Sequence, residues 1–86
     1  MTKHLKKTVV SSDLDGELFL YDGEADAVHI LNPSAGFILD SYLQGHTVEE
    51  IAKALRKTYS VDPERDLRGE IHRFIERIER KKLVVS

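Results

Sequence analysis

The fold of this chain is decided by residues 27–55, which read AVHILNPSAGFILDSYLQGHTVEEIAKAL. The segment opens with the alternating apolar residues of a strand and breaks at Asn32-Pro33. Asn32 is a suitable N-cap, and Pro33 then occupies the first helical position, where no amide donor is needed. A turn at Gly45 precedes the sequence TVEE at 47–50, which is a capping box that starts a second helix. A strand followed by two short capped helices is the core of a winged-helix layout.

Three strands are expected before the first helix. The β-prone run Thr8–Ser11 is followed by a turn at 13–16, and the run Glu17–Tyr21 is followed by a polar connection at 22–26. Ala27–Leu31 forms the third strand. Short connections favour antiparallel neighbours, so the sequence predicts a three-stranded antiparallel meander.

Three helices are expected after the strands. Apolar residues recur at helical spacing over residues 34–43 and 48–59. Asp62-Pro63 offers a further cap and first-turn proline, so we expect the third helix to begin there and to run to about Lys81. The end, Leu83-Val84-Val85, is either a short last strand or an apolar tail that docks on the core.

These elements predict an α+β, winged-helix-like fold in which a three-stranded antiparallel sheet is followed by three helices. Eighty-six residues are enough for one small domain, so we assign residues 1–86 to a single domain and expect residues 1–7 to be flexible. The expected core contains Leu18 or Phe19, Ile38, Leu39, Ile51, Leu55, Ile71 and Phe74.

The composition limits the possible functions. The chain is 41% hydrophobic and has 13 Lys and Arg against 15 Asp and Glu, with a net charge of -2. There is no cysteine, which excludes disulfides, thiolate catalysis and cysteine-ligated metals. No apolar run approaches the roughly 18 residues of a membrane span, and the N-terminus lacks the pattern of a signal peptide. We therefore expect a cytoplasmic protein without a membrane partner.

The residues that usually carry catalysis are scattered. His4, His29, His46 and His72 have no metal-ligand spacing, the serines lack the glycines of a nucleophile elbow, and the glycines form no phosphate-binding loop. The sequence therefore predicts neither an enzyme nor a cofactor or metal site.

Basic residues on the helices leave DNA binding as an alternative function. Arg73, Arg77 and Arg80 follow helical spacing, and the second helix offers Lys53, Arg56 and Lys57. A winged-helix DNA-binding regulator would use such faces against phosphates. Glutamates interleave with these arginines and the net charge is negative, which favours a solvated, salt-bridged helix face and no nucleic-acid partner.

The third strand suggests peptide binding instead. Nothing after it obviously covers its outer edge, and an open edge can add an extended peptide as a further strand. The predicted peptide-binding residues are those of the strand and one face of the third helix: Val28, His29, Ile30, Leu31, Arg68, Ile71, His72, Phe74, Ile75 and Ile78. Arg77 and Lys81 lie at the margin of that face, and each of its apolar residues taken alone is more often part of a core.

Several motifs in a fixed order resemble the PqqD-like family, whose members are recognition elements for ribosomally made, post-translationally modified peptides (RiPPs). They are DGE at 15–17, LYD at 20–22, LNPSAG at 31–36, GxTVEEI at 45–51, YSVDPE at 59–64 and FIERIERKKLV at 74–84. The LNP version is similar to stand-alone elements of lasso-peptide clusters.

This resemblance implies that the precursor's leader peptide adds as a strand beside the third strand and against the third helix. It further implies that the peptide is presented to a modifying enzyme or leader peptidase. Arg68, Arg73 and Arg77 would then be rim charges that speed association with an acidic leader.

Overall fold

The sheet is an antiparallel meander in the computed structural model, which describes residues 3–85. β3 (Glu17–Asp22) lies between β2 (Val9–Leu14) and β4 (Ala27–Leu31). Asp15 and Gly16 join β2 to β3 with φ values of 51° and 83°. Positive φ at both central residues is the mark of a type I′ turn, whose twist matches that of the flanking strands. The predicted meander is confirmed.

The two faces of the sheet have different environments. Leu18 and Leu20 point toward the helices, and Leu20 is only 1% exposed. Because successive side chains alternate, the other face carries Phe19 and its cross-strand neighbours. Its exposed large apolar residues are Val10, Tyr21, Val28 and Ile30, with Leu14 near the turn.

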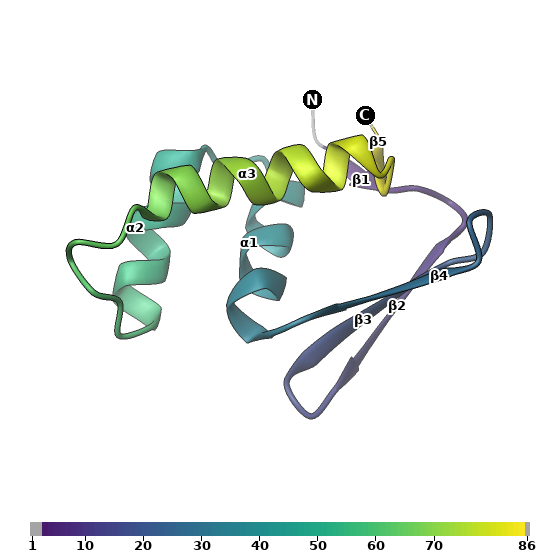
Figure 1. The fold of residues 1–86 in the computed structure, drawn as a ribbon, viewed down its shortest axis with the longest axis horizontal. Helices are drawn as coiled ribbons and strands as arrows, with labels where there is room; N and C mark the ends of the chain where they lie inside the picture. The colour runs from purple at the N-terminus through teal and green to yellow at the C-terminus, as the bar shows by residue number, and fades with distance from the viewer. Residues whose placement is uncertain (1–2, 86) are drawn as a thin grey trace.

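Three helices follow the sheet, as the sequence predicts. They are α1 (Pro33–Leu43), α2 (Val48–Thr58) and α3 (Leu67–Arg80). The side chain of Asn32 accepts a hydrogen bond from the Ala35 amide and caps α1, while the capping box at 47–50 starts α2. α3 runs along the molecule across the top of Figure 1, and the β2–β3 hairpin projects away from the helices.

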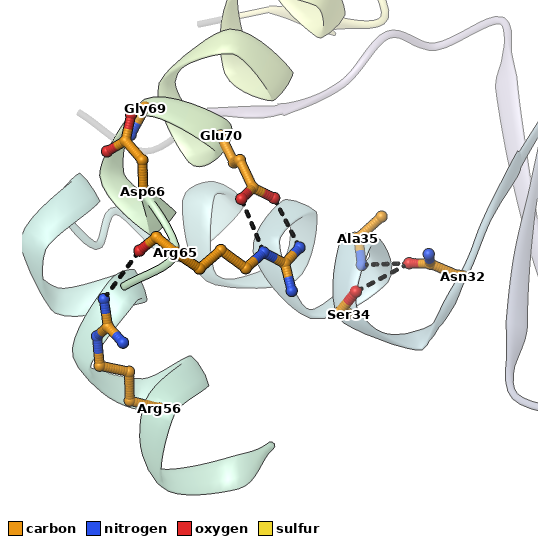
Figure 2. A network of polar contacts seen from close by, with 8 residues as sticks. All are labelled: Asn32, Ser34, Ala35, Arg56, Arg65, Asp66, Gly69 and Glu70. Atoms are coloured by element: carbon orange, nitrogen blue, oxygen red, sulfur yellow. Dashed lines mark hydrogen bonds and ion pairs between the residues drawn. The ribbon is translucent and has the colours of Figure 1, made fainter. Parts of the chain in front are cut away.

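The start of α3 differs from the prediction. Asp62 and Pro63 do not begin the helix. The Asp62 carboxylate accepts a hydrogen bond from the Glu64 amide at 2.9 Å and caps a separate turn. Asp66 is the N-cap, and its Oδ1 accepts from the Gly69 amide at 3.2 Å. Figure 2 shows that the Arg65 guanidinium extends away from Asp66 and donates two hydrogen bonds to the Glu70 carboxylate.

The two ends of the chain form a small second sheet. β1 (His4–Leu5) pairs antiparallel with β5 (Val84–Val85) beside the C-terminal end of α3 (Figure 1). The short C-terminal strand agrees with one of the two predicted alternatives. The backbone partners of β1 belong to a segment distant in sequence, and the expected flexibility of residues 1–7 stays a prediction. For residues 1 and 2 that expectation lies outside the described residues.

Two apolar clusters make up the core. One joins β2, β3, α1 and the C-terminal end of α3, and its buried residues are Val9, Leu20, Leu39, Ile78, Leu83 and Val84. The other joins the three helices, and its buried residues are Ile38, Ile51, Ala52, Leu55, Leu67 and Ile71. Phe74 is half-buried against both clusters. The core prediction is confirmed for the helices, while from β3 the most buried residue is Leu20, with Leu18 packed beside it.

Candidate functional site

β4 is an open edge of the sheet. Gly23 donates its amide to the Thr8 carbonyl at 2.9 Å, which shows which residues of β2 and β3 form the hydrogen-bonded pairs. By that alternation, Leu18 and Leu20 turn their backbone groups toward β4, where they meet Leu31 and His29. No described strand lies on the other side of β4.

Val28 and Ile30 therefore direct their backbone N–H and C=O groups outward from the sheet. Their side chains lie on the exposed outer face, with exposed fractions of 59% and 56%. His29 and Leu31 have the opposite arrangement, because their backbone groups pair with β3 and their side chains turn toward the helices. Two residues of this edge can thus each offer one donor and one acceptor to an added strand.

A groove of about 300 Å³ lies between this edge and α3. We call it the α3 groove, and it is lined by Leu20, Val28, His29, Ile30, Leu31, Phe74, Arg77, Ile78, Lys81 and Leu83. Its floor is apolar, since Leu20, Ile78 and Leu83 are buried and belong to one core cluster. Side chains of a peptide added beside β4 would turn alternately toward this floor.

The rim of the α3 groove is basic. Arg77 and Lys81 are exposed, lie one helical turn apart, and form no ion pair within residues 3–85. Glu79, between them in sequence, is held elsewhere by Lys3 at 2.8 Å and by the Tyr42 hydroxyl. The hydrogen bonds from Lys3 and Tyr42 keep the pKa of Glu79 below its usual value, so this carboxylate stays charged and engaged. The two cations at the rim are left available for an anionic ligand.

A second, smaller hollow continues the groove toward the start of α3. It shares Phe74 and Arg77 with the α3 groove and adds Arg73, Asn32 and Ser34. From Lys81 to Arg73 the helix rises about 12 Å at 1.5 Å per residue. An extended peptide covers that distance with about four residues.

The structure brings part of the predicted site together. Six of its residues line the α3 groove: Val28, His29, Ile30, Leu31, Phe74 and Ile78. Four do not. Ile71 is fully buried in the helical cluster, and Ile75 packs against the same cluster. Arg68 pairs with Glu49 of α2 at 3.0 Å, and exposed His72 pairs with Glu76 at 2.8 Å.

The sequence analysis did not predict two residues that line the α3 groove, Leu20 and Leu83. Leu20 shares the inner face of β3 with Leu18, and the alternation in 17–21 was the signal that could have identified it. Leu83 reaches the groove because Lys82 adopts a φ of 56°, which reverses the chain after α3. A left-handed residue at a helix end is usually glycine, so a lysine there gives no sequence signal.

The comparison with protein families identifies the chain. The family model for coenzyme PQQ synthesis protein D (PqqD) matches residues 17–84, which include the sheet strands β3 and β4 and all three helices. The chain belongs to the PqqD family. The resemblance expected from the motifs is confirmed.

Two solved structures share the PqqD-type fold of this chain. One is described as lasso peptide synthetase B1 complexed with the leader peptide; it is 21% identical, each chain is covered completely, and the TM-score is 0.82. The other is described as TbiB1 in complex with the TbiA(beta) leader peptide; it is 25% identical over 98% of this chain and 94% of that chain, with a TM-score of 0.76. No protein of curated function matches the sequence. The predicted α+β fold is confirmed by these similarities.

Two further findings concern membranes and metals. None of the helices described for residues 3–85 is long and apolar enough to cross a membrane. The same part of the chain contains no group of three His, Cys, Asp or Glu side chains arranged to hold a metal ion.

Proposed function

We propose that this PqqD-family protein captures the leader segment of a ribosomally synthesised precursor peptide. The leader adds as a strand beside β4, and the protein presents it to a modifying enzyme or leader peptidase. The observation that carries the proposal is the open β4 edge alongside a groove with an apolar floor. The descriptions of both structural relatives as leader-peptide complexes support it.

Backbone pairing and side-chain insertion make different contributions to leader binding. Val28 and Ile30 supply outward donors and acceptors, and these hydrogen bonds tolerate many leader sequences. Apolar leader side chains that turn inward cover Phe74 and the buried floor, which supplies selectivity. Because ordering an extended peptide costs conformational entropy, tight binding requires that this apolar burial outweigh the loss.

The basic residues at the rim of the α3 groove should affect mainly the rate at which the leader associates. Arg77 and Lys81 border the groove and Arg73 continues the basic line along α3. Exposed rim charges mainly raise association rates toward a ligand of opposite sign. We therefore expect an acidic residue in the leader to face this rim. Arg68 contributes less, because its guanidinium is engaged by Glu49.

We propose that the protein has no catalytic activity of its own, needs no cofactor and acts in the cytoplasm. Conversion of a precursor peptide by the purified chain alone, abolished by a single substitution, would disprove the first of these statements.

The test is titration of the purified protein with fluorescently labelled leader peptides from precursor genes near its own gene, read as anisotropy. We expect saturable binding to one leader and at least about tenfold weaker binding to its scrambled sequence, which is about 1.4 kcal/mol. Equal affinity for the leader and the scrambled peptide would contradict sequence-selective capture.

The same assay tests the alternative DNA-binding function. A labelled DNA duplex is titrated at several salt concentrations, because phosphate contacts make affinity fall steeply with salt. Tight, salt-sensitive duplex binding without leader binding would replace the proposed function with DNA recognition.

A further inference from the structure

The sheet has a second open edge with a second groove. β2 has no described strand on its outer side, and the β2–β3 hairpin diverges from α1 in Figure 1. A hollow of about 550 Å³ lies between the two and is larger than the α3 groove. We call it the α1 groove.

The β2 edge can accept an added strand for the same geometric reason as the β4 edge. The alternation that pairs Val10 and Ser12 with β3 leaves the backbone N–H and C=O of Ser11 and Asp13 pointing outward. The Ser11 and Asp13 side chains line the α1 groove. The strand carries no Lys, Pro or bulge between Val9 and Leu14, which are three of the features that protect an exposed edge, and its one charged residue is Asp13.

The floor of the α1 groove is apolar and partly fixed. Leu5, Leu18, Phe37 and Leu43 line it and are half-buried. The Phe37 ring is held edge-to-face by Tyr59, with centroids 6.1 Å apart. An inserted apolar side chain would therefore meet a wall that is already in place, which lowers the entropic cost of binding.

The charge of the α1 groove is opposite to that of the α3 groove. Asp13 and Asp40 line it from its two sides and are exposed, and no lysine or arginine lines it. Neither aspartate forms an ion pair within residues 3–85, although Asp40 accepts a hydrogen bond from Gln44 at 2.9 Å. Asp15 and Glu17 extend the negative charge to the tip of the hairpin.

We infer that the α1 groove binds an extended, lysine- or arginine-bearing segment of the enzyme that receives the leader. The segment adds as a strand beside β2, places an apolar side chain against Phe37 and a cation near Asp13 and Asp40. The choice of a cationic segment follows from charge complementarity, and opposite charges on neighbouring strands stabilise their pairing. The identity of the partner as that enzyme rests on the proposed function.

Two matched synthetic peptides test the inference. Each has seven residues with blocked ends and threonine at every odd position, so that the three even positions share one face of the strand. These positions are valine, lysine and valine in one peptide, and valine, glutamate and valine in the other. We expect the lysine peptide to shift the amide resonances of Ser11, Asp13 and the Phe37–Asp40 segment in isotope-labelled protein. The glutamate peptide at the same concentration should leave them unchanged. Equal shifts with both peptides, shifts confined to β4, or no shifts would overturn the inference.

Two variants separate the charge from the backbone. The double variant Asp13→Lys with Asp40→Lys should reverse the preference, so that the glutamate peptide binds at least about fivefold more tightly than the lysine peptide. Ser11→Pro removes an outward amide donor without removing a β2–β3 hydrogen bond, and should abolish the shifts. An unchanged preference in the double variant would overturn the inference even if the proline variant does not fold.

Leader binding is measured on the same proteins to keep the two proposals apart. Neither variant should change leader affinity by more than about twofold, because Ser11, Asp13 and Asp40 line the α1 groove and not the β4 edge. If the leader binds and the lysine peptide does not, the inference fails and the proposed function stands. If the wild-type protein binds no leader, the proposed function fails whatever the peptides do.

Discussion

The two open edges of this sheet have the same backbone and opposite surroundings. On β4 the outward groups belong to Val28 and Ile30, and the neighbouring helix α3 supplies Arg77 and Lys81. On β2 they belong to Ser11 and Asp13, and the facing helix α1 supplies Asp40. Backbone geometry makes both edges able to accept a strand, so the side chains beside each edge decide which peptide it takes.

Net charge conceals this difference. The chain carries a net charge of only -2, yet Arg77 and Lys81 line the α3 groove while Asp13 and Asp40 line the α1 groove. We expect an acidic peptide to be favoured at the β4 edge and repelled at the β2 edge, so that the two proposed ligands would not exchange places. The comparison therefore predicts paired variants with opposite consequences.

The largest effect is expected from proline at one edge. Ile30→Pro removes an outward donor from β4 but no hydrogen bond to β3, and the lost side chain is largely exposed. Leader affinity should fall about a hundredfold, or roughly 2.8 kcal/mol, in the anisotropy titration. Ser11→Pro on β2 is the matched control and should leave leader affinity unchanged.

Circular dichroism would verify that both proline variants are folded. If Ser11→Pro weakened the leader as much as Ile30→Pro, the leader would not distinguish the two edges and the comparison would be wrong.

A smaller effect is expected from the charges of the α3 groove. Reversing Arg77 and Lys81 to glutamate should lower affinity for an acidic leader about tenfold at low salt, mainly through a slower association rate. The loss should shrink as salt screens the rim. Stopped-flow association at two salt concentrations measures this. The double variant Lys53→Glu with Lys57→Glu makes the same change in net charge at exposed positions of α2. An equal loss of leader affinity in that variant would show that net charge, and not the rim of the α3 groove, causes the effect.

Gly36 lines the α1 groove but not the α3 groove, so a substitution there should change stability without changing leader binding. A methyl group added there would lie 3.6 Å from the Leu18 Cβ, an ordinary contact. Gly36→Ala should therefore raise the free energy of unfolding by about 0.5–1 kcal/mol, since alanine favours the helix, without altering leader binding. Urea denaturation measures it.

Gly69→Ala in α3 is the contrasting variant. Its methyl group would lie 2.2 Å from the Asp66 Oδ2, so the capping carboxylate would have to move. It should gain less than Gly36→Ala. A larger gain from Gly69→Ala would contradict the assignment of Asp66 as the cap of α3.

The smallest effect concerns Glu79, which ties the N-terminal segment preceding β1 to α1 and α3 through Lys3 and Tyr42. Hydrogen bonds from these partners lower the pKa of Glu79 in the folded state. A lowered carboxylate pKa stabilises the fold at pH values above the unfolded pKa, usually 4.5, and this stabilisation is lost as the pH falls through the folded pKa. Glu79→Gln should thus be less stable than the wild type at pH 7 and approach it in acid. A stability difference that is constant from pH 7 to pH 3 would contradict this account.

The parts of the fold that depend on local rules were predictable from the sequence. Asn32 and the box at 47–50 cap their helices as expected, because the relevant hydrogen bonds join residues three apart. The start of α3 was misplaced, because Asp62 and Asp66 are both suitable caps and only the folded structure shows which one caps the helix. β1 was not predicted, because it pairs with Val84–Val85 and no local sequence pattern indicates a partner so distant in sequence.

The candidate site was predictable to the same extent. The open edge of β4 follows from the strand order, which short hairpins dictate. The apolar stripe of α3 could not be divided by sequence alone. Its residues Ile71 and Ile75 face the helical cluster while Ile78 faces the groove, since the helix packs against α2 on one side and the sheet on the other.

Amide hydrogen exchange with and without bound leader tests the central claim most directly. The account predicts that leader binding slows exchange at Val28 and Ile30, whose amides point outward. Exchange at His29 and Leu31 should change less, because their amides already pair with β3. Unchanged exchange at Val28 and Ile30, with new protection on the Lys53–Lys57 face of α2, would contradict strand addition at β4.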